Sequence, residues 1–373
     1  MAVSVHDLIY ALLAILLSGL MAFLLTPLVR VLAFRLKAID IPKDDRRMHK
    51  KPTPRLGGLA IFLAFTVTVI LFCNIDVKII GMLCGGVLIA LIGALDDIYR
   101  LSPVVKLIGQ IVASFVPVLC GITIDHINLF GRYYHFGIFA IPITVIWIVA
   151  LTNAINLVDG LDGLACGIST ISAVSIMVFA ILEVDLSIAT IVAILVGACL
   201  GFLPYNRHPA SIFMGDTGAL FLGYTLSVIS ILGVFKVNAF VSFVTPFLIF
   251  GLPLLDTATA MLRRVLHGVS PFHADRGHFH HKLIDLGFNQ KQAVTILYSI
   301  SAIFGISAVL FTAERFIAAI LIIVITFVIG YLNYRNLVGG KQIREQMGLR
   351  LKTVELDDAK NDDKQVKNEG EEK

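Results

Sequence analysis

The sequence predicts an all-α polytopic membrane protein, and its composition and hydropathy pattern carry that prediction. Of its 373 residues, 57% are hydrophobic and only 15% are charged, and the mean hydropathy is +0.89. A soluble domain carries about 25% charged residues. The apolar residues also fall into runs near the length that a helix needs to cross a bilayer, about 20 residues. We therefore expect about eleven transmembrane helices.

The expected helices follow one another along the chain, separated by polar segments. The first is expected to be retained rather than cleaved as a signal peptide, because no basic segment precedes its apolar run. Several of the others are short or contain glycine and proline, so we expect one or two to be tilted or broken. The expected ranges are 8–32, 57–73, 79–95, 107–122, 137–152, 164–182, 187–203, 217–234, 239–262, 292–311 and 315–333.

The basic residues predict the orientation of these helices. Alternate connecting segments and their flanks hold 26 of the 30 lysines and arginines, and the opposite segments hold only Lys78, Arg132, Lys236 and Arg315. Cytoplasmic loops are enriched in Lys and Arg. The N-terminus is thus expected outside, and the C-terminus and the active site on the cytoplasmic side. The basic-rich set comprises 30–55, 96–106, 153–163, 204–216, 263–291 and the C-terminal segment.

Composition divides the chain into two parts. From Lys341 to Lys373 there is no aromatic residue, and 8 basic and 9 acidic residues are present. Such a segment cannot bury enough apolar surface to fold. We expect a membrane domain over 1–340 and a disordered cytoplasmic tail over 341–373. On the outer side, segment 123–136 contains Tyr133 and Tyr134, which predict interfacial anchors or a small hairpin.

The segment NAINLVDGLDGLACG, residues 153–167, is the most unusual polar stretch. Asn156, Asp159 and Asp162 stand three residues apart, so a helical turn would aim them toward roughly one side. Gly160 and Gly163 leave room for a ligand or a backbone to approach. Ionisable groups in or beside a membrane are costly and are commonly functional. The alternative is a loop with solvated acids.

Two further segments place acids at helix ends. GALDDIYR puts Asp96 and Asp97 at the end of the third helix, where they oppose the helix dipole and repel each other. A metal ion, a role as base, or Arg100 and Lys106 would offset them. FLPYNRHPASIFMGDTGAL, residues 202–220, puts Asp216 at the start of the eighth helix. There a carboxylate can hold a divalent cation while backbone amides meet an anion.

Two segments are rich in potential anion ligands. The first loop, residues 40–58, carries a basic run and ends in PTPRLGG, which suits phosphate recognition, although a basic run there also serves as an orientation signal or an anionic-lipid patch. Residues 256–283 hold Arg264 and a histidine cluster. HxHH also invites zinc, but it lacks an HExxH pattern or a cysteine partner. The basic run comprises Arg46, Arg47, His49, Lys50, Lys51 and Arg55, and the cluster His278, His280 and His281.

Acids suited to a hard cation beside bases suited to phosphates indicate phosphoryl transfer, and a membrane location favours a lipid substrate. The metal-type groups are Asp96, Asp97, Asn156, Asp159, Asp162 and Asp216. The anion-type groups are Lys50, Lys51, Arg264, His278, His280 and His281. A secondary transporter is the main non-enzyme alternative, but it predicts acids near the bilayer midplane and an inverted repeat. No nucleic-acid partner is expected.

Taken together, PTPRLGG, GALDD, NAINLVDGLDGLA, NRHPASIFMGDTG and DRGHFHH resemble the polyprenyl-phosphate N-acetylhexosamine-1-phosphate transferases. Phospho-MurNAc-pentapeptide translocase belongs to the same superfamily. The resemblance covers about residues 1–335. It implies an enzyme of the bacterial cell membrane that joins a cytoplasmic UDP-sugar to undecaprenyl phosphate. The products would be undecaprenyl-diphospho-sugar and UMP, with Mg²⁺ as cofactor and Mn²⁺ as a substitute.

The resemblance also assigns residues. The family's magnesium aspartate falls on Asp216, and the paired aspartates, which engage the lipid phosphate or act as base, fall on Asp96 and Asp97. Asp159 and Asp162 and the histidines are grouped with the catalytic set, and the first-loop lysines, Arg55 and Arg264 with the substrate-binding set. The nucleotide-side groups are Asn156, Asp159, Asp162, Asn206 and Phe213, and the histidine loop is His278, His280 and His281. Phe213 would offer a face to the base, although an interfacial anchor is the alternative reading.

The prediction of which sugar the enzyme transfers rests on the histidine loop. DRGHFHH differs from the LHHHFE of the translocase branch and looks like the branch that transfers GlcNAc-1-phosphate to begin teichoic acids or O-antigens. UDP-GlcNAc is therefore the expected donor, and a phospho-MurNAc-pentapeptide transferase is the alternative. A homodimer is compatible with the sequence.

Overall fold

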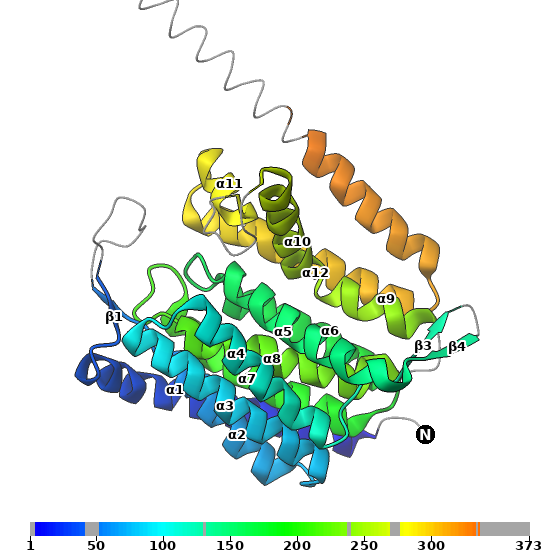
Figure 1. Ribbon diagram of the computed structural model, residues 1–373, viewed down its shortest axis with the longest axis horizontal. Helices are drawn as coiled ribbons and strands as arrows, with labels where there is room; N and C mark the ends of the chain where they lie inside the picture. The colour runs from blue at the N-terminus through cyan, green and yellow to red at the C-terminus, as the bar shows by residue number, and fades with distance from the viewer. Residues whose placement is uncertain are drawn as a thin grey trace, which may run out of the picture. The chain divides into compact units, whose positions relative to one another are not determined.

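The computed structural model describes residues 4–41, 52–129, 132–236, 240–268, 277–332 and 335 (Figure 1). Lys50, Lys51 and the expected tail over 341–373 lie outside these residues. By internal contacts, residues 1–322 form one compact unit and residues 323–373 a second. All the sites considered below belong to the first unit.

The described elements are almost all helices. They are α1 (Val5–Arg35), α2 (Gly58–Phe72), α3 (Val77–Tyr99), α4 (Pro103–Leu119), α5 (Ala140–Val158), α6 (Leu164–Leu182), α7 (Leu186–Asn206), α8 (Gly215–Gly233), α9 (Phe240–Ile249), α10 (Gly251–Leu266), α11 (Phe279–Asp285) and α12 (Gln290–Thr312). A further apolar helix covers Phe316–Leu332. The strands are β1 (Ile39–Asp40), β2 (Thr53–Pro54), β3 (His126–Leu129) and β4 (Arg132–His135).

Within the described residues, seven helices are long and apolar enough to cross a membrane, and three apolar helices are shorter. The chain is therefore an all-α polytopic membrane protein, as predicted. The single helix expected over 239–262 is wrong. Two helices, α9 and α10, meet there at Phe250, whose ψ of 18° is not helical. Pro253 contributes to the break, because it has no N–H to bond the carbonyl of Ile249.

Helix α8 lies at the centre of the bundle, packed between α3 and α5 (Figure 1). Its residues are buried along nearly its whole length. Glycines on its neighbours allow this close packing: a Cβ at Gly58 of α2 or at Gly93 of α3 would collide with the backbone near Thr217. Small residues let membrane helices approach closely. The start of α8, which carries Asp216, is thus fixed by two other helices.

Helices α1 and α7 pack against each other in the same way. Gly19 of α1 faces Gly197 and Gly201 of α7, and a Cβ at either α7 glycine would collide with the α1 backbone. Van der Waals packing of this kind is a main source of helix association in membranes, because lipid tails are as apolar as the helices. This packing fixes α7 against α1 and so positions the polar segment that follows α7.

The two small sheets lie at opposite ends of the bundle (Figure 1). The β3–β4 hairpin confirms the hairpin reading of segment 123–136. At the other end, β1 pairs with β2, and the loop after β2 pairs with the α7–α8 loop: Phe213 donates its N–H to the Pro54 carbonyl, and Gly57 donates to the Phe213 carbonyl. These bonds bring Arg55 beside the start of α8.

Candidate active site

Four carboxylates gather where α3 ends and α8 begins. Asp96 and Asp97 come from the last turn of α3, Asp216 from the first turn of α8, and Asp159 from the residue that ends α5. The predicted positions of Asp96, Asp97 and Asp216 at helix ends are confirmed. Burial of so many like charges is costly unless each is paired, so the partners of each carboxylate define the site.

Asp97 binds the beginning of α8. Its carboxylate accepts hydrogen bonds from the backbone N–H of Asp216 and of Thr217, both at 3.0 Å, and from the Thr217 hydroxyl at 2.7 Å. The first amides of a helix have no partner within the helix and carry its positive dipole end. Asp97, only 4% exposed, satisfies them from another helix. It is therefore the anchor that positions Asp216.

Gly215 makes this anchor possible. Its φ is +71°, which favours glycine. A Cβ at this position would lie 2.5 Å from an Asp97 carboxylate oxygen and 2.6 Å from the Arg55 carbonyl. The glycine of FMGD therefore permits the close approach of α3 and the first loop to Asp216.

Lys106 joins two of the carboxylates. Its Nζ lies 2.8 Å from the Asp96 carboxylate and 3.2 Å from the Asp216 carboxylate. Sequence reasoning named Lys106 only as a counterion for the Asp96–Asp97 pair and left it out of the site. The missed signal was a lysine one turn into the apolar helix α4, ten residues after Asp96.

Arg55 supplies the second cation. Its guanidinium lies 3.4 Å from Asp97 and 3.7 Å from Asp216. Burial opposes its charge, but the negative charges of Asp97 and Asp216 outweigh burial and raise the pKa of Arg55. Arg55, predicted to bind substrate, thus also belongs to the acidic cluster.

Asn156 completes the shell of Asp216. Its side-chain amide donates to the Asp216 carboxylate at 2.6 Å. One turn earlier on α5, the Asn153 amide donates to the Gln110 side chain of α4. Helix α5 extends to Val158, six residues beyond its expected end, and this extension carries both asparagines to their partners.

Asp159 lies close enough to this cluster for the charges of the other carboxylates to affect its pKa. Burial, followed by the charges of Asp216 and Asp97, raises the pKa of Asp159 to about 8. Among the described residues, the cluster thus contains four carboxylates and two side-chain cations, Lys106 and Arg55. Its net charge is negative when all of these groups are ionised. Such an excess of negative charge favours the binding of a cation.

The donor set fits magnesium. No group of three or more His, Cys, Asp or Glu residues in the described part of the chain could hold a metal by itself. Mg²⁺ is commonly held by one or two carboxylates, with waters and substrate phosphates as the remaining ligands. Asp216, with carboxylate and amide neighbours, has the chemistry for that kind of site.

Asp162 does not point toward Asp216 with Asn156, and the expectation of a shared side is wrong for it. The helix has ended at Val158, and Gly163 adopts a φ of +77°. The Asp162 carboxylate instead accepts from the His208 ring Nδ1 at 2.8 Å and from the Ala210 N–H at 3.1 Å. Asp162 thus holds the segment before α8.

The two remaining predicted nucleotide-side residues also lie in that segment. The Asn206 side chain, 3% exposed, donates to the Ile212 carbonyl at 3.1 Å and closes the loop between α7 and α8. Phe213 is half-buried, and its backbone pairs with the first loop. These hydrogen bonds shape the loop between α7 and α8.

The histidine segment packs against the α5–α6 turn. His278 donates from Nδ1 to the Asp256 carboxylate of α10 at 2.9 Å, and the Phe279 N–H donates to the other oxygen of Asp256 at 2.8 Å. Asp256 therefore fixes the beginning of α11. Asp256 is a residue of this segment that the sequence analysis does not place in the site.

The three histidines differ in exposure. His280 is 3% exposed, and a Cβ at Gly160 would collide with its ring. Burial and then the neighbouring His281 lower the pKa of His280 to about 4, so this ring is neutral near pH 7. His281 is half-buried, and Arg264 is buried on α10. His280 therefore supplies packing rather than positive charge.

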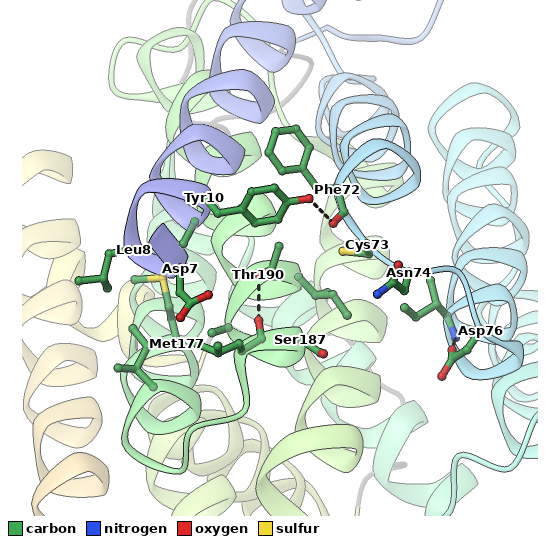
Figure 2. Close-up of a pocket in the computed structure, with 16 residues that line it drawn as sticks. Asp7, Leu8, Tyr10, Phe72, Cys73, Asn74, Asp76, Met177, Ser187 and Thr190 are labelled. Carbon is green, nitrogen blue, oxygen red and sulfur yellow. Dashed lines mark hydrogen bonds between the residues drawn. The ribbon is translucent and has the colours of Figure 1, made fainter. Parts of the chain in front are cut away.

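A separate cavity of about 450 Å³ lies at the opposite end of α3 (Figure 2). It is lined by the first turns of α1, α3 and α7 and by the ends of α2 and α6, including Asp7, Tyr10, Asp76 and Ser187. The 23 residues of α3 separate it from Asp96 and Asp97 by about 30 Å. None of its 16 lining residues is basic, so it does not resemble a phosphate site.

Comparison with known proteins identifies similar sequences among membrane sugar-phosphate transferases. Residues 79–234 match the model of glycosyl transferase family 4. The chain is 38% identical over 319 residues to a probable undecaprenyl-phosphate N-acetylglucosaminyl 1-phosphate transferase of Bacillus subtilis, covering 84% of this chain and 88% of the relative. It is 35% identical to a decaprenyl-phosphate N-acetylglucosaminephosphotransferase of Mycobacterium leprae, covering 83% and 86%. A phospho-N-acetylmuramoyl-pentapeptide-transferase of Caldicellulosiruptor bescii is 31% identical, covering 79% and 95%.

The raised pKa of Asp159 predicts how stability depends on pH. A carboxyl whose pKa is higher in the folded than in the unfolded state stabilises the fold when protonated, so stability falls as pH rises from about 4 to about 8. The variant Asp159→Asn lacks this titration. In EDTA, the melting temperature of the purified wild type should fall more between pH 5 and pH 8 than that of the variant. Parallel curves would show that Asp159 titrates normally.

Proposed function

The chain belongs to the polyprenyl-phosphate N-acetylhexosamine-1-phosphate transferases of glycosyl transferase family 4, and we propose that it transfers GlcNAc-1-phosphate from UDP-GlcNAc to undecaprenyl phosphate. The products are undecaprenyl-diphospho-GlcNAc and UMP. The observation that carries this proposal is the cluster of Asp96, Asp97 and Asp216 held together by Lys106 and Arg55.

The reaction exchanges one phosphoanhydride for another. An oxygen of the lipid phosphate forms a bond to the β-phosphorus of the UDP-sugar, and the bond from that phosphorus to the bridging oxygen breaks. UMP leaves with the bridging oxygen and its electron pair. The lipid phosphate is already largely ionised near pH 7, by analogy with phosphorylated side chains of second pKa about 6. The enzyme therefore needs positioning and charge neutralisation more than a strong base.

The residues at the acidic cluster suit these tasks. Asp216 would hold Mg²⁺, with Asn156 fixing its carboxylate, and Mn²⁺ would substitute. The metal would supply neutralisation of phosphate charge. Lys106 and Arg55 lie at the same carboxylates, where they would attract phosphate oxygens of the substrates. Asp96 and Asp97 organise the cations rather than act as nucleophiles.

Groups on the surrounding loops would bind the donor. His278 and His281, with Arg264 on α10, would face the nucleotide-sugar, and Phe213 would stack on the base. Lys50 and Lys51 of the first loop are proposed to meet phosphate as well. His280 is proposed to belong to the same set, and its buried, neutral ring also packs against the α5–α6 turn.

The sugar is proposed from two observations. The relatives named for GlcNAc-1-phosphate transfer are 38% and 35% identical over 84% and 83% of this chain. Relatives named for phospho-N-acetylmuramoyl-pentapeptide are 31% identical over 79% of it, or 38% identical over only 58%. The DRGHFHH loop also differs from LHHHFE. The product would begin a cell-envelope polymer such as a teichoic acid or an O-antigen.

Incorporation of radiolabel into lipid tests the reaction. Purified protein with undecaprenyl phosphate and Mg²⁺ should convert UDP-[¹⁴C]GlcNAc into a butanol-extractable product and release UMP. UDP-MurNAc-pentapeptide should give no lipid product. Label transfer from the pentapeptide donor alone would make the protein the translocase of peptidoglycan synthesis, and the absence of any lipid product would favour a transporter.

Replacement of Asp216 tests the metal site. Asp216→Asn should lower turnover by roughly 100-fold or more, because the amide cannot hold a divalent cation as the carboxylate does. Electron paramagnetic resonance should show weaker binding of Mn²⁺ to the variant in the absence of substrates. The control is Asp185→Asn, at the N-cap of α7, which should retain turnover. Normal Mn²⁺ binding by Asp216→Asn would remove this residue from the metal site.

We also propose that the acidic cluster faces the cytoplasm, with the enzyme in the cytoplasmic membrane. The split of 26 to 4 Lys and Arg residues supports this orientation. A single cysteine introduced at Tyr133, in an otherwise cysteine-free variant, should react with an impermeant maleimide added to intact cells. A cysteine at Arg207 should react only after permeabilisation. The opposite pattern would invert the topology.

A further inference from the structure

His208 occupies an unusual position in the segment between α7 and α8. Its ring Nδ1 lies 2.8 Å from the Asp162 carboxylate, and the same carboxylate oxygen accepts the Ala210 N–H at 3.1 Å. Asp162 comes from the α5–α6 turn, 46 residues earlier in the chain. A carboxylate from one loop thus holds the imidazole of another, and it fixes which ring nitrogen carries the inward hydrogen bond.

The segment that carries His208 is held by several other bonds. The Asn206 side chain closes it by donating to the Ile212 carbonyl, and Ser211 donates to the Tyr205 carbonyl through both its N–H and its hydroxyl. The Asp162–Ala210 bond adds a further tie. Because these contacts define the loop without the imidazole, packing alone does not require a histidine at position 208.

The ring is also accessible. The His208 side chain is 37% exposed, against 12% for Asp162. Within the part of the chain that the structure describes, its hydrogen bond is made through Nδ1, which leaves Nε2 to meet a ligand. The adjacent Arg207 side chain is exposed, and no described carboxylate pairs with it. Two potential donors to an anion thus stand side by side on a well-held loop.

The loop belongs to the end of the bundle that carries the acidic cluster. His208 precedes Asp216 by eight residues, and the intervening Phe213 pairs with the first loop beside Arg55. Asp162 is near enough to Asp159 for its charge to contribute to the raised pKa of that residue. The α7–α8 segment and Asp216 therefore lie at the same end of the bundle, where one extended ligand could contact both.

We propose that His208 is a binding residue for the diphosphate of the UDP-sugar, and that Asp162 is a positioning residue that acts through His208. The inference rests on the proposed function. Nδ1 donates to Asp162 while Nε2–H donates to a phosphate oxygen, a charge-assisted bond to which Arg207 adds positive charge. The soluble donor reaches this loop from water, whereas the lipid phosphate approaches from the bilayer.

The variant His208→Asn isolates the outward nitrogen. Asparagine places an amide donor close to the position of Nδ1 and retains the bond to Asp162, but it has no counterpart of Nε2. A hydrogen bond to a charged group contributes about 1.5–3 kcal/mol, and 1.4 kcal/mol is a factor of about 10 in affinity. We expect the KM for UDP-GlcNAc to rise about 10-fold or more, with the KM for undecaprenyl phosphate within about 2-fold of wild type.

Inhibition by UDP identifies the part of the donor that is bound. The Ki of UDP should rise with the KM in His208→Asn, while the weaker inhibition by uridine should not change. His135→Asn, an equally simple change on the exposed strand β4 at the other end of the bundle, is the matched control and should leave all constants unchanged.

A double-mutant cycle tests the role of Asp162. Asp162→Asn should raise the same KM, and it should add nothing in the His208→Asn background, because coupled residues are not additive. Additive effects would overturn the positioning role. An unchanged KM for UDP-GlcNAc in His208→Asn, or an effect confined to kcat or to undecaprenyl phosphate, would overturn the binding role. A wild-type protein without transfer activity would instead refute the proposed function, and that is seen before any variant is made.

Discussion

The hydrogen bonds from the first turn of α8 to Asp97 are the interaction on which the rest of the site depends. A carboxylate at the end of α3 opposes the dipole of its own helix, and it gains the amides at the start of α8 in return. The two helix ends become complementary. This arrangement needs Gly93 and Gly215 at the contact, because a side chain at either would force the helices apart. Asp216 is placed as a consequence, with its carboxylate turned to Asn156, Lys106 and Arg55.

The same interaction explains how four acids coexist near a membrane. Asp97 is satisfied by backbone amides and a hydroxyl, and it shares the Arg55 guanidinium with Asp216. Lys106 pairs with Asp96 and Asp216, and Arg55 pairs with Asp97 and Asp216, so each of these three carboxylates lies beside a cation. Burial, followed by the charges of Asp216 and Asp97, raises the pKa of the fourth carboxylate, Asp159. A cluster with more carboxylates than cations is suited to a divalent metal and, through that metal, to phosphates, whereas a fully neutralised cluster would hold neither tightly.

Sequence reasoning predicted those parts of the fold and of the site that depend on local pattern. The apolar runs predicted most of the helices. The boundaries of those runs predicted that Asp96, Asp97 and Asp216 lie at helix ends. The failures concern tertiary contacts. Periodicity placed Asp162 with Asn156, but the backbone turns at Gly160 and Gly163, and the carboxylate meets His208 instead. The burial of His280 follows from the packing of its ring against Gly160, which the residue type alone does not indicate. Lys106 was underestimated because its two partners lie on different helices.

These failures have the same physical cause: the residues concerned are positioned by contacts between segments that are far apart in the sequence. The acidic cluster is built on helix ends, whose positions follow from hydropathy and from glycine contacts, and its chemistry can be read from short motifs. The histidines are held differently: Asp162 fixes His208, and Asp256 fixes His278, each through Nδ1 and each across a large separation in sequence. In both pairs the carboxylate also accepts a backbone N–H of the histidine's own segment, so the loop and the ring are set together. Each carboxylate thus fixes both the backbone and the histidine side chain of a segment through long-range hydrogen bonds. The histidine loops, which we propose bind the nucleotide-sugar, therefore depend on long-range contacts, which a motif does not contain.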